Sequence, residues 1–595
     1  MNQYSPPLDD FSFLLNQVFN INKHLQHCGL EQDADLAIAV AEEAGKLATD
    51  KLGPLNWSGD VEGATWTDGE VQTPQGFKAA YQEFCEGGWN GLRFPEQYGG
   101  QALSSTVSTM VDEIWHAANM SFALCPMLTN GAIEALLTAG SDQQKSLYLP
   151  KLVSGEWTGT MNITEPSAGS DLGAIQTKAI PAGDGTFRIT GQKIFITYGE
   201  HDLAENIVHL VLARVAGGPT GVKGLSLFLV PKFLVNDDGT LGDRNDLKCV
   251  SIEHKLGIHG SPTAVMQFGE VDSAIGYLIG EENRGLEYMF IMMNDARFSV
   301  GIQGLSISSR AYLHALSYAK ERVQGGAVGE PGAKGSTIIR HPDIRRLLLS
   351  MKSKIEAMRA LAMYVAMQRD VCHSSKVEST ERSAAQSRLE FLIPVLKGWF
   401  TEVAQDITYD AIQVFGGMGF IEETGVAQHY RDARIVTIYE GTTAIQANDL
   451  VGRKTLRDSA GEAYRLLEEI GQEISMLSSI NHPACSIMTE QLEFALVEMK
   501  LVLNWMLGKS REAPREVYAG SVPYLQMWGL ICGAWMHARR LNAILSNVEE
   551  LDSTGSAVIS SALFFAEQVL PQAVAMSCGI RNGGEFALNY PDSAW

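Results

Sequence analysis

The segment TFRITGQKIFITYG, residues 186–199, decides the fold class of this 595-residue chain. Apolar and polar residues alternate along it, which is the period of a half-buried β-strand. Three more strand-like segments lie nearby, separated by Gly, Pro and Asp clusters: 205–215, 223–233 and 264–271. We therefore expect a compact antiparallel β domain between about residues 160 and 280.

On both sides of these strands, apolar residues recur at helical spacing. The first helix, 33–54, is expected to end at Gly53-Pro54 and to lead into a polar, Gly-rich loop. The remaining segments are a loop at 56–76, helices near 76–88, 104–116 and 142–152, long helices at 299–324, 341–370 and 381–415, a Gly-rich loop at 325–337, and a helical block at 455–595.

The order helix, β, helix fits neither a doubly wound α/β fold nor a repeat solenoid. We predict a mainly α protein with a central antiparallel β domain and a C-terminal helical extension. Its five expected parts are an N-terminal extension (1–35), an N-terminal helical domain (36–159), a middle β domain (160–282), a second helical domain (283–455) and the C-terminal extension (456–595).

Composition excludes several classes of partner. A net charge of −23 argues against nucleic acid and anionic membranes. The eight cysteines show no CxxC and no metal spacing, so we expect reduced thiols in the cytoplasm and no metal site. The first apolar stretch follows Asp9 and Asp10 rather than Lys or Arg, and no run of eighteen apolar residues occurs. Neither a secretory signal nor an integral membrane contact is expected.

The usual nucleotide and hydrolase motifs are absent. There is no GxxxxGK[ST], no GxGxxG between a strand and a helix, no GxSxG and no HExxH. Any dinucleotide must therefore be held in another way. GGMGF at 416–420, taken alone, favours a tight turn between helices.

The segment TMNITEPSAGSDLGAIQTKA, residues 160–179, joins the helical pattern to the β pattern. It combines hydroxyls, carboxylates and two glycines, whose free backbone N–H groups can bind a ring edge or phosphate oxygens. A capped turn with no ligand is an equally good interpretation.

The segment RDARIVTIYEGTTAIQ, residues 431–446, places Glu440 in an apolar stretch. Gly441 follows at once, and Thr443-x-x-Gln446 has the pattern of a capping box that opens a helix. The helix N-terminus would stabilise the carboxylate, whereas burial would favour the neutral acid. A carboxyl group in this setting suits removal of a proton next to a carbonyl. A glutamate that only caps the helix is the alternative.

Together the motifs of this chain resemble the acyl-CoA dehydrogenase family. They occur in the order and spacing of that family between about residues 35 and 455. The family's fold, a helical domain followed by a β domain and a four-helix domain, agrees with the pattern read above. The motifs are TEPSAGSDL (164–172), GQKIFITYG (191–199), NDAR (294–297), AKERVQG (319–325), QVFGGMGF (413–420) and YEGTTAIQ (439–446).

The resemblance implies that Glu440 is the catalytic base. It would take the α-proton of an acyl-CoA thioester while a hydride passes from the β-carbon to flavin N5. Its backbone N–H, with a ribityl hydroxyl of the flavin, would polarise the thioester carbonyl. Ala296 stands where some relatives carry their base, so Glu440 has no competitor.

The resemblance also implies an FAD site and a coenzyme A site. Asn294 replaces a frequent Asp, Phe195 replaces a frequent Trp, and Gly325 replaces an aromatic residue near the FAD. The implied FAD contacts are Met161, Ile163, Thr164, Phe195, Thr197 and Thr442, with Arg322, Gln413 and Gly417 reaching the FAD of a neighbouring subunit. The implied substrate contacts are Ser170, Asn294, Arg297 and Gly441.

FSFLL (11–15), NWSGD (56–60), SIEHKLGIHGSPT (251–263) and the extra C-terminal helices resemble the larger, C-terminally extended family members. These include 3-(methylthio)propanoyl-CoA dehydrogenases of dimethylsulfoniopropionate degradation and fatty acyl-CoA dehydrogenases. The implied reaction is oxidation of 3-(methylthio)propanoyl-CoA to 3-(methylthio)acryloyl-CoA, or of a medium- or long-chain fatty acyl-CoA. Electron-transferring flavoprotein is the implied acceptor. An oxidase and a non-catalytic flavin- or acyl-CoA-binding protein are the alternatives.

The C-terminal extension is rich in apolar helix, as at 524–541 and 561–571, and this apolar face must be buried. Smaller relatives commonly form tetramers through their helical domains. We expect the extension to cover that surface and to leave a homodimer. Packing on its own subunit, with tetramers still possible, is the alternative.

Overall fold

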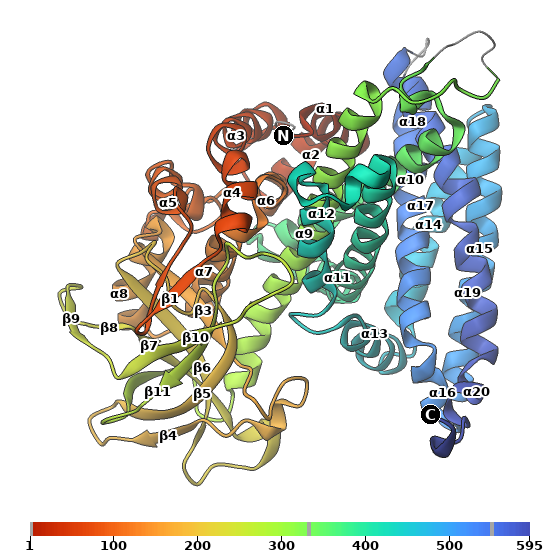
Figure 1. Cartoon of the computed structure of the whole chain (residues 1–595). Helices are drawn as coiled ribbons and strands as arrows, with labels where there is room; N and C mark the ends of the chain where they lie inside the picture. The colour runs from red at the N-terminus through yellow and green to blue at the C-terminus, as the bar shows by residue number, and fades with distance from the viewer. Residues whose placement is uncertain (1–3, 330–334, 548–551) are drawn as a thin grey trace. The chain divides into compact units, whose positions relative to one another are not determined.

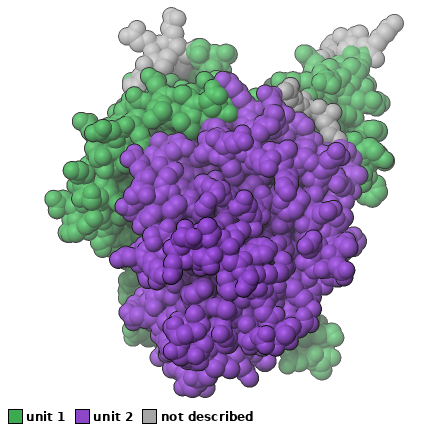
Figure 2. Space-filling model, turned by 90° about the vertical axis from the view of Figure 1, so that its left-hand side faces the viewer, with its two compact units in different colours: residues 1–43, 104–117, 300–595 green, residues 44–103, 118–299 purple. Residues whose placement is uncertain are grey.

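The computed structural model describes residues 4–329, 335–547 and 552–595 (Figure 1). The predicted fold class is confirmed, because long helices flank a central set of strands. The chain divides into two compact units. Unit 1 comprises residues 1–43, 104–117 and 300–595, and unit 2 comprises residues 44–103 and 118–299. Figure 2 shows unit 2 in purple as one continuous mass, although two separate stretches of chain build it.

An eight-stranded sheet forms the centre of unit 2. Its order is β10-β11-β5-β12-β7-β6-β3, and β4 pairs with both β5 and β6. Most ladders are antiparallel as predicted, but β3 and β4 each run parallel to β6. The strands are β3 (Trp157–Asn162), β4 (Lys178–Pro181), β5 (Phe187–Thr197), β6 (Asn206–Val215), β7 (Leu225–Pro231), β10 (Leu247–Ile252), β11 (Thr263–Phe268) and β12 (Ala274–Ile279).

The predicted loop at 56–76 is wrong. Helix α4 (Gly53–Glu62) occupies its first part, and the ribbon of β1 (Thr65–Thr67) and β2 (Glu70–Gln72) follows. Pro54 does not end a helix, because it stands in the first turn of α4, where its missing N–H costs nothing.

Helix α7 (Met120–Ala139) was not predicted, since it is apolar on nearly every side and shows no stripe. It packs against β3 in the core of unit 2. By length and composition, α7 and the segment Ser553–Asn582 could each cross a membrane, but 83% and 44% of their apolar windows are buried inside the protein. The high value for α7 identifies it as a core helix. Unit 2 also contains helices α5 (Phe77–Glu86) and α8 (Asp142–Ser154) and the ribbon of β8 (Phe233–Val235) and β9 (Leu241–Arg244).

Long helices form the part of unit 1 that precedes the C-terminal extension. Residues 300–321 of α9 (Gly285–Glu321) belong to it, and α10 and α11 pack along each other. Residues 330–334 of the predicted Gly-rich loop lie outside the described residues. The other helices here are α1 (Leu8–Phe13), α2 (Ile21–His27), α6 (Ser105–Ala118), α10 (Pro342–His373), α11 (Ser379–Phe415), α12 (Val426–Ala433) and α13 (Thr443–Val451), and α3 (Ala34–Leu47) begins in unit 1.

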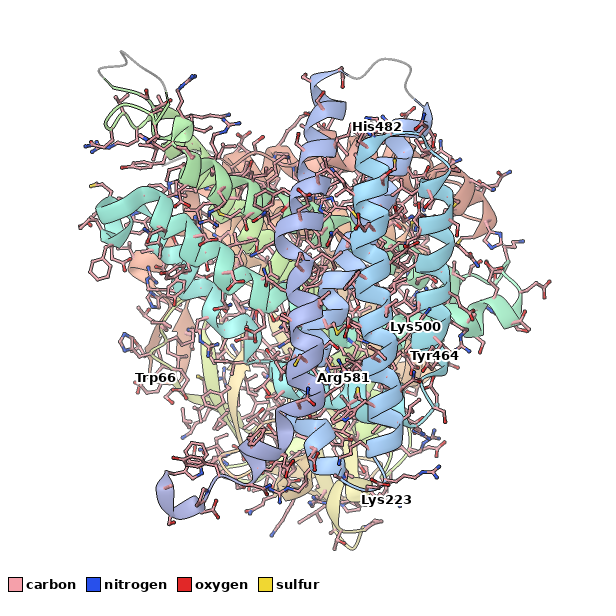
Figure 3. All side chains as sticks on the ribbon, turned by 90° about the vertical axis from the view of Figure 1, so that its right-hand side faces the viewer. Trp66, Lys223, Tyr464, His482, Lys500 and Arg581 are labelled. Carbon is pink, nitrogen blue, oxygen red and sulfur yellow. The ribbon has the colours of Figure 1, made fainter. Side chains whose placement is uncertain are left out.

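The C-terminal extension packs on its own chain. Helix α17 (Ser521–Asn547) lies against α10, α11 and α13. A Cβ added at Gly529 of α17 would lie 2.1 Å from Cγ of Trp399, so glycine allows the close approach. Figure 3 shows the outer helices side by side: α14 (Gly461–Ser478), α15 (Pro483–Lys509) and α19 (Pro571–Asn582) carry Tyr464, Lys500 and Arg581.

A buried charge cluster joins α1 to three other helices of unit 1. Arg359 of α10 donates to Asp10 at 2.7 Å and to Glu113 of α6 at 2.6 Å. Arg540 of α17 donates to the other carboxylate oxygen of Asp10 at 2.8 Å. Burial raises the pKa of Asp10, but the charges of Arg540 and Arg359 outweigh burial and hold the pKa below its ordinary value. Asp10 is therefore ionised and tied to both arginines.

Candidate active site

Each unit carries a part of the predicted site. Glu440, Gly441 and Thr442 lie in unit 1, together with the predicted partner-reaching residues Arg322, Gln413 and Gly417. The remaining predicted contacts belong to unit 2: Met161, Ile163, Thr164, Ser170, Phe195, Thr197, Asn294 and Arg297.

Glu440 lies in a strained turn immediately before α13. Its φ is +55° and that of Gly441 is +89°, so two successive residues adopt left-handed backbone conformations. A side chain at Gly441 would place its Cβ 2.8 Å from Nε2 of Gln446. A non-glycine residue in this conformation costs on the order of 1–3 kcal/mol, and such residues cluster at functional sites. The strain at Glu440 therefore favours a catalytic residue.

The predicted capping box is wrong. Thr442, not Thr443, is the N-cap of α13, and its hydroxyl accepts from the backbone N–H of Ile445 at 3.4 Å. Gln446 instead turns back and donates to the carbonyls of Glu440 at 3.1 Å and Gly441 at 3.2 Å. Because Thr442 supplies the cap, the helix does not need the carboxylate of Glu440 for this purpose.

Two side chains of α11 also contact this turn. Lys397, which is fully buried, donates from Nζ to the carbonyl of Gly441 at 2.8 Å. Glu402 accepts a hydrogen bond from the hydroxyl of Thr443 at 2.5 Å. Lys397 was not predicted as a site residue, although a lysine within the apolar run LIPVLKGWF (392–400) is a usable signal.

Residues 164–172 of unit 2, the motif TEPSAGSDL, form a tight turn that follows β3. Glu165 and Ala168 exchange two backbone hydrogen bonds of 3.0 Å, and the carboxylate of Asp171 caps the N–H of Gly173 at 2.9 Å. The capped turn considered above is thus present. It leaves Thr164 half-buried and Ser170 exposed, so both side chains remain accessible.

A buried ion pair holds this turn on β5. Lys193, fully buried, donates to Glu165 at 2.8 Å and to the carbonyl of Ile163 at 3.0 Å. Burial lowers the pKa of Lys193 to about 8 even though Glu165 opposes that shift. The backbone N–H of Ile194 also donates to the carbonyl of Thr164 at 2.9 Å. Residues 163–165 therefore have a fixed position beside β5.

Phe195 follows on the same strand with 58% of its side chain exposed and a φ of +61°. An exposed aromatic face can stack against a planar ligand, and the left-handed backbone of Phe195 is a strained conformation of the kind that clusters at functional sites. Met161, Ile163 and Thr197 are half-buried on the neighbouring strand ends. This arrangement fits a planar ring system such as a flavin, with Phe195 against it and Thr164 at its edge.

The start of α9 carries the predicted substrate contacts. Asn294 is half-buried and Arg297 is buried. Asp295 forms a bidentate ion pair with Arg93, at 2.9 and 2.8 Å. The acid next to Ala296 is therefore occupied, which leaves Glu440 as the better candidate for a base.

Arg322, Gln413 and Gly417 are exposed in unit 1. Arg322 donates to Gln324 at 3.5 Å, which is too long to fix its guanidinium. A side chain at Gly417 would meet no atom within 4 Å. Among the described residues, no group of three or more His, Cys, Asp or Glu residues could hold a metal ion.

Comparison with known families covers nearly the whole chain. The acyl-CoA dehydrogenase N-terminal domain matches residues 38–156, the middle domain 160–271 and the C-terminal domain 283–454. An acetyl-CoA dehydrogenase C-terminal-like domain matches residues 466–591.

Individual relatives agree with these matches. A 3-methylmercaptopropionyl-CoA dehydrogenase of Ruegeria pomeroyi is 48% identical over 94% of both chains. A broad-specificity linear acyl-CoA dehydrogenase of Mycobacterium tuberculosis is 33% identical over 96% of both chains. A Bacillus anthracis acyl-CoA dehydrogenase solved with FAD shares the fold, with a TM-score of 0.75 at 20% identity over 99% of this chain and 93% of that one. The chain belongs to the acyl-CoA dehydrogenase family and is an enzyme.

Proposed function

We propose that this enzyme oxidises 3-(methylthio)propanoyl-CoA to 3-(methylthio)acryloyl-CoA, with Glu440 as the base that takes the α-proton. The 48% identity to the Ruegeria pomeroyi enzyme, spread over 94% of both chains, is the observation that carries this substrate. The strained turn at Glu440 supports the catalytic role. A linear fatty acyl-CoA is the second candidate substrate, because the Mycobacterium tuberculosis relative acts on linear acyl-CoA.

The cofactor is FAD, which when bound supplies the acceptor for the hydride that leaves the β-carbon. Phe195 would lie against the flavin ring, and Thr164 would bond its edge. Phe195 is exposed and Thr164 is half-buried on unit 2, beside the Lys193–Glu165 pair, which supports this assignment. By the same family resemblance, Met161, Ile163, Thr197 and Thr442 would also contact the FAD.

Substrate binding would rest on two residues of α9, on the turn that follows β3 and on the turn that precedes α13. Arg297 offers a buried cation for the anionic coenzyme A, and Asn294 and Ser170 offer neutral hydrogen bonds. Gly441 has no side chain and lets the thioester come close to Glu440. Proton removal and hydride loss together form the α,β-double bond, and Glu440 keeps the proton.

Electrons would then pass to electron-transferring flavoprotein in the cytoplasm. The five sequence regions proposed above remain our domain assignment, and the matches at 38–156, 160–271, 283–454 and 466–591 support their boundaries.

Anaerobic titration with a panel of acyl-CoA thioesters tests the function. We expect the flavin absorbance to bleach at the lowest concentration with 3-(methylthio)propanoyl-CoA. Preferential bleaching by a medium- or long-chain acyl-CoA would assign the enzyme to fatty acid oxidation. Rapid hydrogen peroxide formation in air would instead identify an oxidase, and no bleaching by any thioester would identify a binding protein.

We further propose a homodimer in which Arg322, Gln413 and Gly417 reach the FAD of the partner subunit. All three are exposed on unit 1, and the guanidinium of Arg322 is loosely held. The C-terminal extension covers α10 and α11, which argues against a tetramer built through these helices.

Arg322→Ala should therefore release FAD and dissociate the dimer together. A charge-assisted hydrogen bond is worth roughly 1.5–3 kcal/mol. Light scattering should give about twice 64.8 kDa for the wild type and a lower mass for the variant, with flavin absorbance falling in parallel. Lys320→Ala, two residues away at the end of α9, is the control. Full flavin content and wild-type mass in Arg322→Ala would rule out the shared site, and a tetrameric wild type would rule out the homodimer.

A further inference from the structure

We propose that Lys397 and Gln446 are positioning residues for the catalytic base. Both hold the strained turn of Glu440 and Gly441 from the interior of unit 1, and so determine where the turn presents Glu440. This inference rests on the proposed role of Glu440 and adds two residues that act through it.

Lys397 is an unusual residue for the middle of a core helix. It is fully buried on α11, between apolar neighbours such as Leu396 and Trp399. A buried ammonium group is costly unless it is hydrogen-bonded. Its Nζ donates a 2.8 Å hydrogen bond to the carbonyl of Gly441. This bond offsets part of the cost of burying the charge and also holds the turn that carries Glu440. An apolar residue at this position would satisfy the helix packing but not the turn.

Gln446 acts on the same turn from the first turn of α13. It is also fully buried, and one amide nitrogen bridges the carbonyls of Glu440 and Gly441, at 3.1 and 3.2 Å. The hydroxyl of Thr442 already caps α13. The bonds from Gln446 therefore restrain the residues before the cap, where Glu440 lies, rather than the helix itself.

These contacts fix the direction of two backbone N–H groups. The C=O and N–H of a trans peptide point in opposite directions, and the described chain contains no cis peptide. Because the carbonyls of Glu440 and Gly441 point toward the donors on Lys397 and Gln446, the N–H groups of Gly441 and Thr442 point away from them. Neither N–H has an acceptor among the described residues. The turn thus presents Glu440 together with two backbone N–H groups that can donate hydrogen bonds.

The test replaces each donor with an apolar residue of similar length, Lys397→Met and Gln446→Met, in the full-length enzyme loaded with FAD. Thr401→Val is the matched control. Thr401 is buried one turn along α11, and among the described residues its hydroxyl bonds only to carbonyls of that helix, Lys397 at 2.7 Å and Gly398 at 3.3 Å. The control loses a buried hydrogen bond on the same helix without changing the turn.

We expect Lys397→Met to lower kcat about 10²-fold, the loss typical of a misplaced catalytic group, with little change in KM. The primary deuterium isotope effect on kcat with α-deuterated substrate should rise, because proton removal becomes the slow step. Gln446→Met should show the same signature. The double variant should lose less than the product of the two single losses, because both residues act through one turn. Thr401→Val should keep the wild-type kcat and isotope effect.

Wild-type kcat and isotope effect in both methionine variants would overturn the inference, as would losses explained by lower flavin content or by an unfolding temperature well below that of Thr401→Val. A rise in KM at constant kcat would also overturn it. If Lys397→Met does not fold, Gln446→Met decides alone. Glu440→Gln distinguishes failure of the proposed base from failure of the positioning role. Full turnover in Glu440→Gln would refute Glu440 as the base. An inactive Glu440→Gln together with methionine variants of normal activity would refute only the positioning role.

Discussion

Glu440→Gln is expected to abolish nearly all turnover while FAD and acyl-CoA remain bound. The amide preserves the volume of the side chain but cannot accept the α-proton, and loss of a general base typically costs at least ~10²–10⁴-fold. Glutamine also tolerates the left-handed backbone at this position about as well as glutamate, so the turn should persist. Stopped-flow measurement of flavin bleaching after substrate addition gives the rate directly.

Glu423→Gln is the control for this change, because Glu423 is exposed in the short segment before α12. It should leave the bleaching rate unchanged. Residual activity above a tenth of wild type in Glu440→Gln would show that another group removes the proton.

Arg359→Met should cause the largest loss of stability. The change leaves Glu113 buried without its partner and removes one of the two arginines that bind Asp10. Breaking a buried ion pair by removing one partner typically costs about 3–5 kcal/mol. Denaturation followed by circular dichroism should show a lower midpoint for the helix signal.

Arg346→Met is the matched control on the same helix. Arg346 pairs with Asp343, but 55% and 71% of their side chains are exposed. Exposed pairs contribute only about 0–1 kcal/mol, so this variant should remain close to wild type. Equal midpoints for the two variants would mean that the cluster around Arg359 does not stabilise unit 1.

The periodic segments of the sequence predicted the fold well, and the aperiodic ones did not. The alternating strands at β5 and β6 and the striped helices α10 and α11 lie where expected. Helix α7 escaped prediction because burial on nearly every side removes the stripe on which such predictions depend. The parallel pairing of β3 with β6 depends on tertiary contacts, which local alternation does not encode.

The sequence suggested candidate site residues where they stand close together along the chain, and their roles remain predictions. Glu440 and the turn at 164–172 stand in short motifs. The structure shows a left-handed backbone conformation at Glu440 and a hydrogen-bonded turn at Glu165. The residues that hold these turns were missed, because Lys397 and Lys193 come from distant segments that read as core. For Lys397 the only signal was a charge inside an apolar run.

The bond between Asp10 and Arg540 spans 530 residues and has a consequence for synthesis of the chain. A ribosome adds ~5–20 residues per second, so it reaches Arg540 roughly 25–105 s after it has added Asp10. During that interval the apolar segment around Phe13 cannot reach its final place against Ala543 and Ile544 of α17. This segment therefore stays exposed until the chain has been made as far as Arg540, and chaperones can bind it during that time.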